Sequence, residues 1–225
     1  MNEILTVLQS SNLFKGKSLD EINLSLSKII YKVQTYQENE IIFSPNKIAD
    51  TMGIVLSGSI HIQKLLPSGK VVIITKKSCS DLIAEPSIFA KKKYYPTTAI
   101  VYKTCKILLI HKKDLLKLFS MDEQIMTNFL ESVSNSMLIL KHKIGILSLN
   151  SIQERIVGFL MHACKEHNST IITLPFSKKA WAEYMNVSRT SLSRELRNLE
   201  IRGVISFDRQ NIEIKDFEKL HEILF

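Results

Sequence analysis

The spacing of apolar and polar residues changes twice along this chain, and each change predicts a different kind of structure. After a short predicted helix at residues 19–31, apolar runs of β type are separated by turn signals such as Ser57-Gly58 and Pro67-Ser68-Gly69. Many short strands at nearly even spacing are typical of a β-roll or a β-sandwich. A single helical turn is expected at Pro86–Ala90. The predicted strands are Tyr31–Tyr36, Glu40–Phe43, Met52–Leu56, Ser59–Leu65, Val71–Lys76, Thr97–Tyr102 and Lys106–His111. We therefore expect a β-domain over residues 1–120.

Residues 121–149 have a helical periodicity instead, with no proline and with Gly145 as the only glycine. Their apolar residues recur at alternating spacings of four and three, which is the a/d pattern of a two-helix coiled coil. A helix that packs only against its own domain usually has a broader apolar face, and it is the alternative here. We call these residues the apolar seam: Met126, Leu130, Val133, Met137, Leu140, Ile144 and Leu147. The segment predicts a dimerisation helix, with a second copy of the chain as partner.

Residues 150–225 combine helical and β-type runs. The predicted elements are a helix at Ile152–His167, a strand at Ile171–Leu174 and a hairpin formed by Val204–Phe207 and Asn211–Ile214 around Asp208-Arg209-Gln210. Between the strand and the hairpin lies SKKAWAEYMNVSRTSLSRELRNLEIR, residues 177–202, which has the pattern of a helix-turn-helix. A helix-turn-helix followed by a small hairpin predicts a winged helix over residues 150–225.

The turn and the two caps of this helix-turn-helix are visible in its residue types. Ser177 can cap a first helix that runs through Met185, and Ser188 can cap a second. Asn186 stands between them, where a turn needs a residue that tolerates the left-handed conformation. In the second helix Leu192, Leu196 and Leu199 form one buried stripe, and Gly203 can end it.

The opposite side of the second helix carries arginines and hydroxyl residues. Such a face suits the major groove of DNA, because Arg can donate two hydrogen bonds to a guanine edge and hydroxyl groups can hydrogen-bond to either base of a pair. A merely solvated face is the alternative interpretation. The residues expected to contact DNA are Ser177, Lys178, Lys179, Ser188, Arg189, Thr190, Ser191, Ser193, Arg194 and Arg197.

The type of basic residue is more informative about DNA binding than the net charge. The net charge of +8 is concentrated in residues 1–149, but all six arginines follow residue 150. Arg is the planar, bidentate donor that base and phosphate recognition favours. The lysine clusters Lys76-Lys77, Lys91–Lys93 and Lys112-Lys113 are expected to be solvated loops.

Several classes of protein are excluded by what the sequence lacks. No apolar run approaches the ~18 residues of a membrane span, and the first residues lack the pattern of a signal peptide, so we expect a cytosolic protein. Cys79, Cys105 and Cys164 have no metal-ligand spacing. They are expected to be core or surface thiols, and neither a metal nor a cofactor is predicted. No catalytic triad, P-loop or GxGxxG motif is present, so an enzyme is not expected.

Four segments of the chain together resemble the Crp/Fnr family of bacterial transcription regulators. The first is GIVLSGSIHI (53–62), which together with the following Pro67-Ser68-Gly69-Lys70 turn is similar to the family's strand–Gly–strand hairpin. The others are SDLIAEPSIF (80–89), LSLNSIQERIVGFL (147–160) and SKKAWAEYMNVSRTSLSREL (177–196). The last segment is the most specific. The resemblance implies a cyclic-nucleotide-binding-type β-roll, a long dimerisation helix and a winged helix.

The chain departs from the family pattern where cyclic AMP binds. Members that bind this nucleotide hold its phosphate with an Arg-Ser pair, whereas Tyr94–Ala99 contains no Arg and none occurs before Arg155. A buried phosphate would thus lose a strong, charge-assisted contact. Ser80 and Ala84 replace the two glycines of the family's Gly-Asp-x-x-Gly-Glu segment. The candidate effector-pocket residues are Glu85, Thr97 and Thr98. The cysteine cluster of the iron–sulfur members is absent as well.

We therefore predict an α+β fold and a homodimeric regulator that binds a pseudo-palindromic operator in double-stranded DNA without control by cyclic AMP. Thr190 replaces a family Glu in the recognition helix, so the base preference there should differ. RNA polymerase is a further candidate partner, and any small-molecule effector is unidentified. The alternative is a ligand-sensing module whose main output is contact with another protein.

Overall fold

The computed structural model describes residues 2–69, 71–174, 177–208 and 211–224. The chain divides into two compact units, one up to Asn135 and one from Ser136 onward. The long helix α5 (Glu123–Leu147) begins in the first unit and ends in the second. Within the described residues no helix is both long and apolar enough to cross a membrane.

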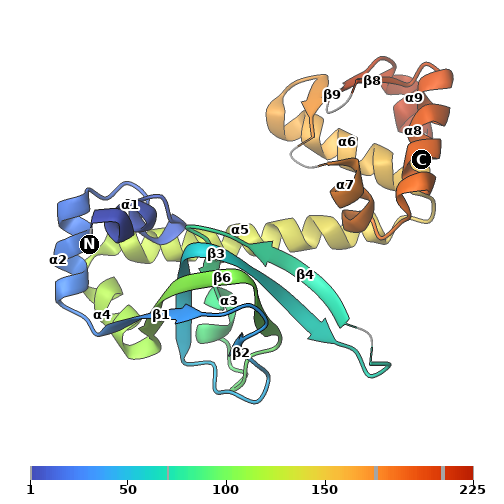
Figure 1. Ribbon diagram of the computed structural model, residues 1–225. Helices are drawn as coiled ribbons and strands as arrows, with labels where there is room; N and C mark the ends of the chain where they lie inside the picture. The colour runs from blue at the N-terminus through green and yellow to red at the C-terminus, as the bar shows by residue number, and fades with distance from the viewer. Residues whose placement is uncertain (1, 70, 175–176, 209–210, 225) are drawn as a thin grey trace. The chain divides into compact units, whose positions relative to one another are not determined.

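The first unit is an antiparallel sheet with short helices (Figure 1). Its strands are β1 (Tyr31–Tyr36), β2 (Ile41–Phe43), β3 (Thr51–Leu65), β4 (Val71–Lys77), β5 (Leu82–Ile83) and β6 (Thr98–His111). The order β1-β6-β3-β4 makes the main path, with β2 paired to β6 and β5 paired to β3. Its helices are α1 (Asn2–Gln9), η1 (Asn12–Phe14), α2 (Leu19–Ser27), α3 (Glu85–Ile88) and α4 (Lys112–Met121).

Alternation along the long strands gives this unit two apolar clusters. In β3, Ile54 and Leu56 belong to the cluster shared with the helices, while Val55 belongs to the other cluster within the sheet. The same alternation separates Leu108 from Ile107 in β6, as expected because successive strand residues point to opposite faces. The start of α5 packs into the helical cluster as well.

The predicted turn at Ser57-Gly58 is wrong. Strand β3 is continuous through these residues, and its pairing with β6 shifts register around Ser57 and Ser59, which is a β-bulge. Gly58 has a φ of +83°, and a Cβ there would lie 2.7 Å from the Cα of Cys105. The positive φ that suggested a turn therefore belongs to a bulge within β3, and β3 pairs with β4 across the segment that contains Pro67-Ser68-Gly69. In the same way β6 is one strand rather than two.

Two of the three lysine clusters are also corrected. Lys76-Lys77 lies in β4 and Lys112-Lys113 lies in the first turn of α4, so only Lys91–Lys93 lies outside helices and strands. The predicted helix at residues 19–31 ends at Ser27. Helices α1 and α4 were not predicted from the sequence.

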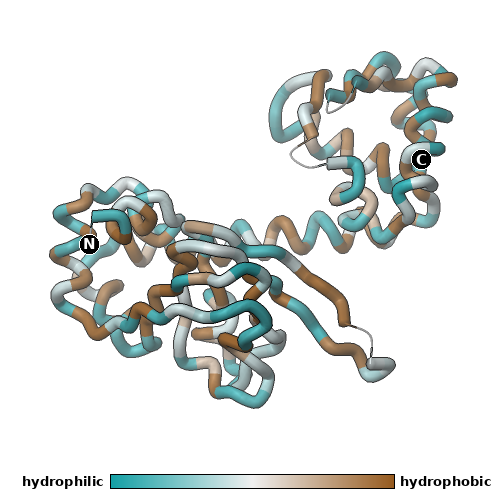
Figure 2. Tube along the Cα trace, in the orientation of Figure 1, coloured by the Kyte–Doolittle hydropathy of each residue, from teal (hydrophilic) through white to brown (hydrophobic). Residues whose placement is uncertain are grey.

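Strand β4 is an edge of the sheet, and its first four residues are exposed apolar side chains. Successive strand residues point to opposite faces, so Val71–Ile74 leaves both faces of this edge uncovered. Figure 2 shows the same stretch as a hydrophobic segment of the hairpin.

The second unit contains the end of α5 and the predicted winged helix. Its further elements are α6 (Ile152–His167), β7 (Ile171–Thr173), α7 (Lys178–Tyr184), α8 (Arg189–Ile201), β8 (Ile205–Asp208), β9 (Asn211–Ile214) and α9 (Phe217–Glu222). The three strands form an antiparallel sheet in the order β7-β9-β8. Helix α9 was not predicted. Of the expected hairpin turn, Arg209 and Gln210 lie outside the described residues.

Candidate nucleic-acid interface

Local capping builds the helix-turn-helix of α7 and α8. The Ser177 hydroxyl accepts a hydrogen bond from the backbone N–H of Ala180 at 3.3 Å, and the Ser188 hydroxyl accepts one from Ser191 at 3.0 Å. Asn186 has a φ of 54°, as predicted. The N–H of Val187 then bonds the carbonyl of Ala182 at 3.0 Å, which closes the turn. These contacts fix where α8 begins.

The buried stripe of α8 sets which of its faces is free. Leu192, Leu196 and Leu199 are fully buried in one cluster with Trp181 of α7 and Leu160 of α6. Burial of a Leu side chain contributes roughly 1.5–3 kcal/mol, so this stripe holds α8 in one rotational setting. The opposite side of the helix must therefore face outward.

That outward side includes five exposed polar residues that we call the recognition face: Arg189, Thr190, Ser193, Arg194 and Arg197. Arg194 and Arg197 are each about 70% exposed at the side chain and pair with Glu195 and Glu200 of the same helix. Exposed ion pairs contribute only ~0–1 kcal/mol, so a phosphate or a base edge can replace these acids. Among the described residues the side chain of Arg189 makes no ion pair or hydrogen bond.

The remaining predicted DNA-contact residues divide between capping and charge. Ser188 lies 2.8 Å from both the Thr190 and the Ser191 hydroxyls, so these three groups form one cap. The ammonium group of Lys178 lies 4.3 Å from the centre of the Phe207 ring in β8, whereas Lys179 is exposed. Lys178 therefore links α7 to the wing.

Arg155 holds the turn in place, and its role was not predicted. Its Nε donates to the carbonyl of Leu149 at 3.1 Å, and its Nη1 donates to the carbonyl of Met185 at 3.4 Å. One guanidinium thus joins the segment before α6 to the end of α7. Only the family resemblance around Glu154-Arg155 singled out this residue in the sequence.

Most of the apolar seam of α5 has no cover within one chain. Leu130, Met137, Leu140 and Ile144 are each more than half exposed. Met126, Val133 and Leu147 are partly buried, and Val133 packs against the helical cluster of the first unit. Leu138 and Ile139 are also more than half exposed, although they lie outside the predicted seam.

Of the candidate effector residues, Glu85 is the buried one, with 5% of its surface exposed. Its carboxylate lies 3.4 Å from the ammonium group of Lys77 in β4. Burial raises the pKa of Glu85, and the charge of Lys77 opposes this rise. Thr97 and Thr98 are half-buried, and no hydrogen bond among the described residues joins them to Glu85. The sequence prediction missed Lys77, which was counted among the loop lysines.

The two positions where the family segment has glycine share one backbone conformation. Ser80 and Ala84 have φ values of 69° and 67°, in the left-handed region that glycine favours. Ala84 is the residue directly before α3, so it sets the backbone that buries Glu85.

The three cysteines are free thiols, of which Cys105 is buried. Burial raises the pKa of Cys105 to about 11 and also raises the pKa of Cys164. A raised pKa removes the thiolate that reactive cysteines need. Cys79 is exposed, and its Sγ lies 3.3 Å from the carbonyl of Leu56.

Comparisons with known proteins agree with both halves of this architecture. The cyclic nucleotide-binding domain family matches residues 33–122, and the Crp-like helix-turn-helix domain family matches residues 154–223. The Anaerobic regulatory protein of Bacillus subtilis (strain 168) is 23% identical over 197 residues, which are 84% of this chain and 83% of that protein.

Two solved structures share the fold. The Thermus thermophilus catabolite activator protein has a TM-score of 0.56 at 19% identity, covering 96% of this chain and 99% of that one. A CooA mutant from Carboxydothermus hydrogenoformans has a TM-score of 0.62 at 16% identity, covering 98% and 95%.

A cyclic-nucleotide-binding-type sheet domain, followed by a long helix and a helix-turn-helix domain, defines a two-domain transcription regulator. The α+β fold predicted from the sequence is thereby confirmed. The chain belongs to the Crp/Fnr family of transcription regulators.

Proposed function

We propose that this regulator recognises specific sequences in double-stranded DNA through α8. The recognition face carries the proposal, because it presents three arginines and two hydroxyls opposite a fully buried leucine stripe. Arg reads guanine edges with two hydrogen bonds, and hydroxyl groups can hydrogen-bond to either base of a pair. Lys179 and the capped start of α8 can meet phosphates, which position the protein without reading sequence.

A gel-shift titration of the purified protein on genomic fragments tests this proposal. We expect a subset of fragments to shift at low protein concentration, with an affinity that falls steeply as salt rises. The bound fragments should share a pseudo-palindrome with half-sites about one helical turn apart. Equal affinity for all fragments would contradict sequence-specific binding. The absence of any shift at low salt would contradict DNA binding altogether.

The same proposal includes a homodimer formed along α5. Its support is the exposed apolar seam, because a run of uncovered leucines, isoleucines and methionines on one helix is costly in water. A parallel pair of α5 helices would bury the seam and present two recognition faces to successive major grooves. Analytical ultracentrifugation at micromolar concentration tests the dimer directly.

We also propose that cyclic AMP does not control DNA binding in the family's usual manner. No Arg precedes Arg155, and the buried carboxylate of Glu85 is already paired with Lys77. One relative is called Cyclic AMP receptor protein, whereas the name of another, Anaerobic regulatory protein, mentions no nucleotide. Calorimetry with cyclic AMP and cyclic GMP, beside DNA binding by the ligand-free protein, tests the proposal. Micromolar nucleotide affinity, or DNA binding that requires the nucleotide, would contradict it.

Contact with another protein is a second candidate output, and β4 favours it. The exposed apolar edge at Val71–Ile74 has unpaired backbone groups that a partner strand or surface can cover. RNA polymerase is the candidate partner to test first, by surface plasmon resonance with the purified holoenzyme. The variant Ile73→Lys should lose such binding while keeping its DNA affinity, and equal binding by wild type and variant would contradict this output.

A further inference from the structure

A pocket of about 550 Å³ lies in the second unit, between the last turns of α5 and the middle of α6. Small-molecule sites typically occupy roughly 300–1,000 Å³. Two glycines, Gly145 on α5 and Gly158 on α6, line it, and a Cβ added to Gly145 would meet no atom within 4 Å. Gly145 therefore leaves open space in the pocket, whereas a Cβ at Gly158 would lie 3.0 Å from Cδ1 of Leu149.

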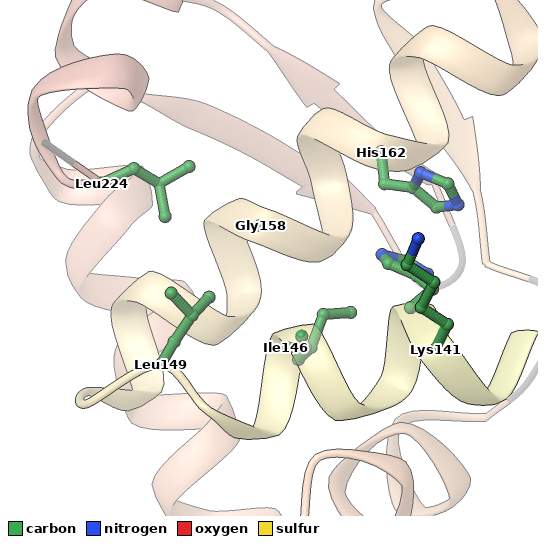
Figure 3. Close-up of a pocket in the computed structure, with 8 residues that line it drawn as sticks. Lys141, Ile146, Leu149, Gly158, His162 and Leu224 are labelled. Carbon is green, nitrogen blue, oxygen red and sulfur yellow. The ribbon is translucent and has the colours of Figure 1, made fainter. Parts of the chain in front are cut away.

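The lining of this pocket has one basic end and one apolar end. Figure 3 shows Lys141 and His162 together on one side, and Leu149 and Leu224 on the other. The rings of His142 and His162 are 3.5 Å apart between centroids, so both imidazoles belong to the basic end. Ile146 completes the apolar floor.

The charge at the basic end fits a single negative charge. Burial lowers the pKa of His142, with a further decrease from His162, while Glu166 acts in the opposite direction. Lys141 supplies an ammonium group at this end, and the imidazoles can supply N–H donors. Glu166 is not part of the lining, but its carboxylate lies 3.3 Å from Nε2 of His162. Lys143 is held elsewhere, over the ring of Tyr184.

The pocket lies on the side of α5 that the apolar seam leaves free. His142 and Ile146 stand two residues before and after Ile144, so at 3.6 residues per turn they project from the opposite face of the helix. A dimer formed along the seam would therefore leave the pocket open.

We propose that this pocket binds a small amphipathic carboxylic acid, with the carboxylate at Lys141, His142 and His162 and the hydrocarbon part against Ile146, Leu149 and Leu224. Such a ligand would bridge the dimerisation helix to α6 of the DNA-binding unit, and so act as an effector. The binding itself does not depend on the proposed DNA function, because it is measured without DNA.

Isothermal titration calorimetry of the full-length protein with octanoate tests the site. We expect saturable binding of one octanoate per protomer. The uncharged octanamide should bind at least roughly tenfold more weakly, a difference of ~1.4 kcal/mol or more in binding free energy. Gly145→Leu places its Cβ where no atom lies within 4 Å and should improve helix propensity. The variant should therefore fold, and its octanoate affinity should fall by at least about tenfold. Absence of saturable heat, or unchanged affinity in Gly145→Leu, would overturn the proposal.

The charged end has its own matched pair of variants. Lys141→Gln should weaken octanoate roughly tenfold, whereas Lys165→Gln, an exposed lysine of α6 outside the lining, should bind like wild type. A bound carboxylate should also raise the pKa of His142, which a nuclear magnetic resonance titration measures with and without octanoate. Equal effects of the two lysine variants, or an unmoved pKa, would overturn the assignment of the carboxylate to this end.

A membrane surface could present the same chemistry as a free acid, and flotation with phosphatidylglycerol vesicles distinguishes the two. Protein that floats with vesicles yet takes up no octanoate would overturn the proposal of a free ligand. If octanoate binds and the affinity for operator DNA stays unchanged, the effector role fails. A protein that binds octanoate but no DNA would refute the proposed function alone.

Discussion

The ammonium group of Lys77 lies 3.4 Å from Oε1 of Glu85 and offsets the cost of burying this carboxylate. Removing one partner of a largely buried pair leaves the other uncompensated. We therefore expect Lys77→Met to lower the free energy of unfolding at pH 7 by roughly 1–3 kcal/mol. Lys76→Met, the exposed neighbour in β4, is the control and should change stability little.

The loss of unfolding free energy in Lys77→Met should be smaller at low pH than at neutral pH. Burial raises the pKa of Glu85 in the folded state, so the folded protein binds a proton more readily than the unfolded chain. Stability from this group is therefore present at low pH and is lost as pH rises through the folded pKa. Without Lys77 the folded pKa should rise further, and denaturant titrations near pH 5 should show a smaller deficit than at pH 7. An equal deficit at both pH values would argue against an ionised Glu85.

The backbone before α3 offers a second stability prediction. Ala84 has a φ of 67°, and left-handed backbone costs a non-glycine residue roughly 1–2 kcal/mol. Ala84→Gly removes this strain but gains entropy in the unfolded chain, so we expect a net stabilisation of about 1 kcal/mol or less, with a similar result for Ser80→Gly. Thermal unfolding measures both variants. Ser87→Gly, inside α3 and outside the positive-φ positions, should instead destabilise.

The helix-turn-helix and the bulge at Gly58 show why only part of the fold was predictable from the sequence. The caps at Ser177 and Ser188, the turn at Asn186 and the leucine stripe of α8 depend on neighbours a few residues away, so their pattern is visible in the sequence. The positive φ at Gly58 was equally visible, but whether it makes a turn or a bulge depends on Cys105 in another strand.

Side-chain partners across the fold were the least predictable. Lys77 was assigned to a loop, because nothing in a local pattern shows that it reaches Glu85. The contacts of Arg155 with Leu149 and Met185 and the pocket beside Gly145 arise in the same way from helix packing. Sequence periodicity identifies which face of an element is buried, but it does not identify what lies opposite.

The recognition face leads to a prediction for DNA affinity. Arg189→Ala and Arg194→Ala should each cost roughly 1–3 kcal/mol on the specific site if each reads a base. Both side chains are exposed and carry little of the folding energy, so stability should be unchanged. Fluorescence anisotropy with operator and with scrambled DNA measures the effect, which should be confined to the operator.

Two lysines serve as comparisons for that measurement. Lys179→Ala should weaken operator and scrambled DNA alike and reduce the salt slope by about one phosphate contact. Lys219 lies in α9, outside the helix-turn-helix, and pairs with Asp216. Lys219→Ala is therefore the matched control and should not change DNA affinity. Unchanged operator affinity in Arg194→Ala would show that this arginine does not read a base.

The apolar seam gives the prediction for assembly, and the structure refines which residues to change. Val133 packs into the first unit, so Met137→Glu with Leu140→Glu disturbs the seam more cleanly. Two buried charges carry a large desolvation cost, so the variant should sediment as a folded monomer and lose operator affinity. Leu138→Glu is the matched control, because Leu138 is equally exposed but lies outside the a/d pattern, and it should remain dimeric. Should Leu138→Glu dissociate the dimer while the seam variant does not, another face of α5 forms the interface.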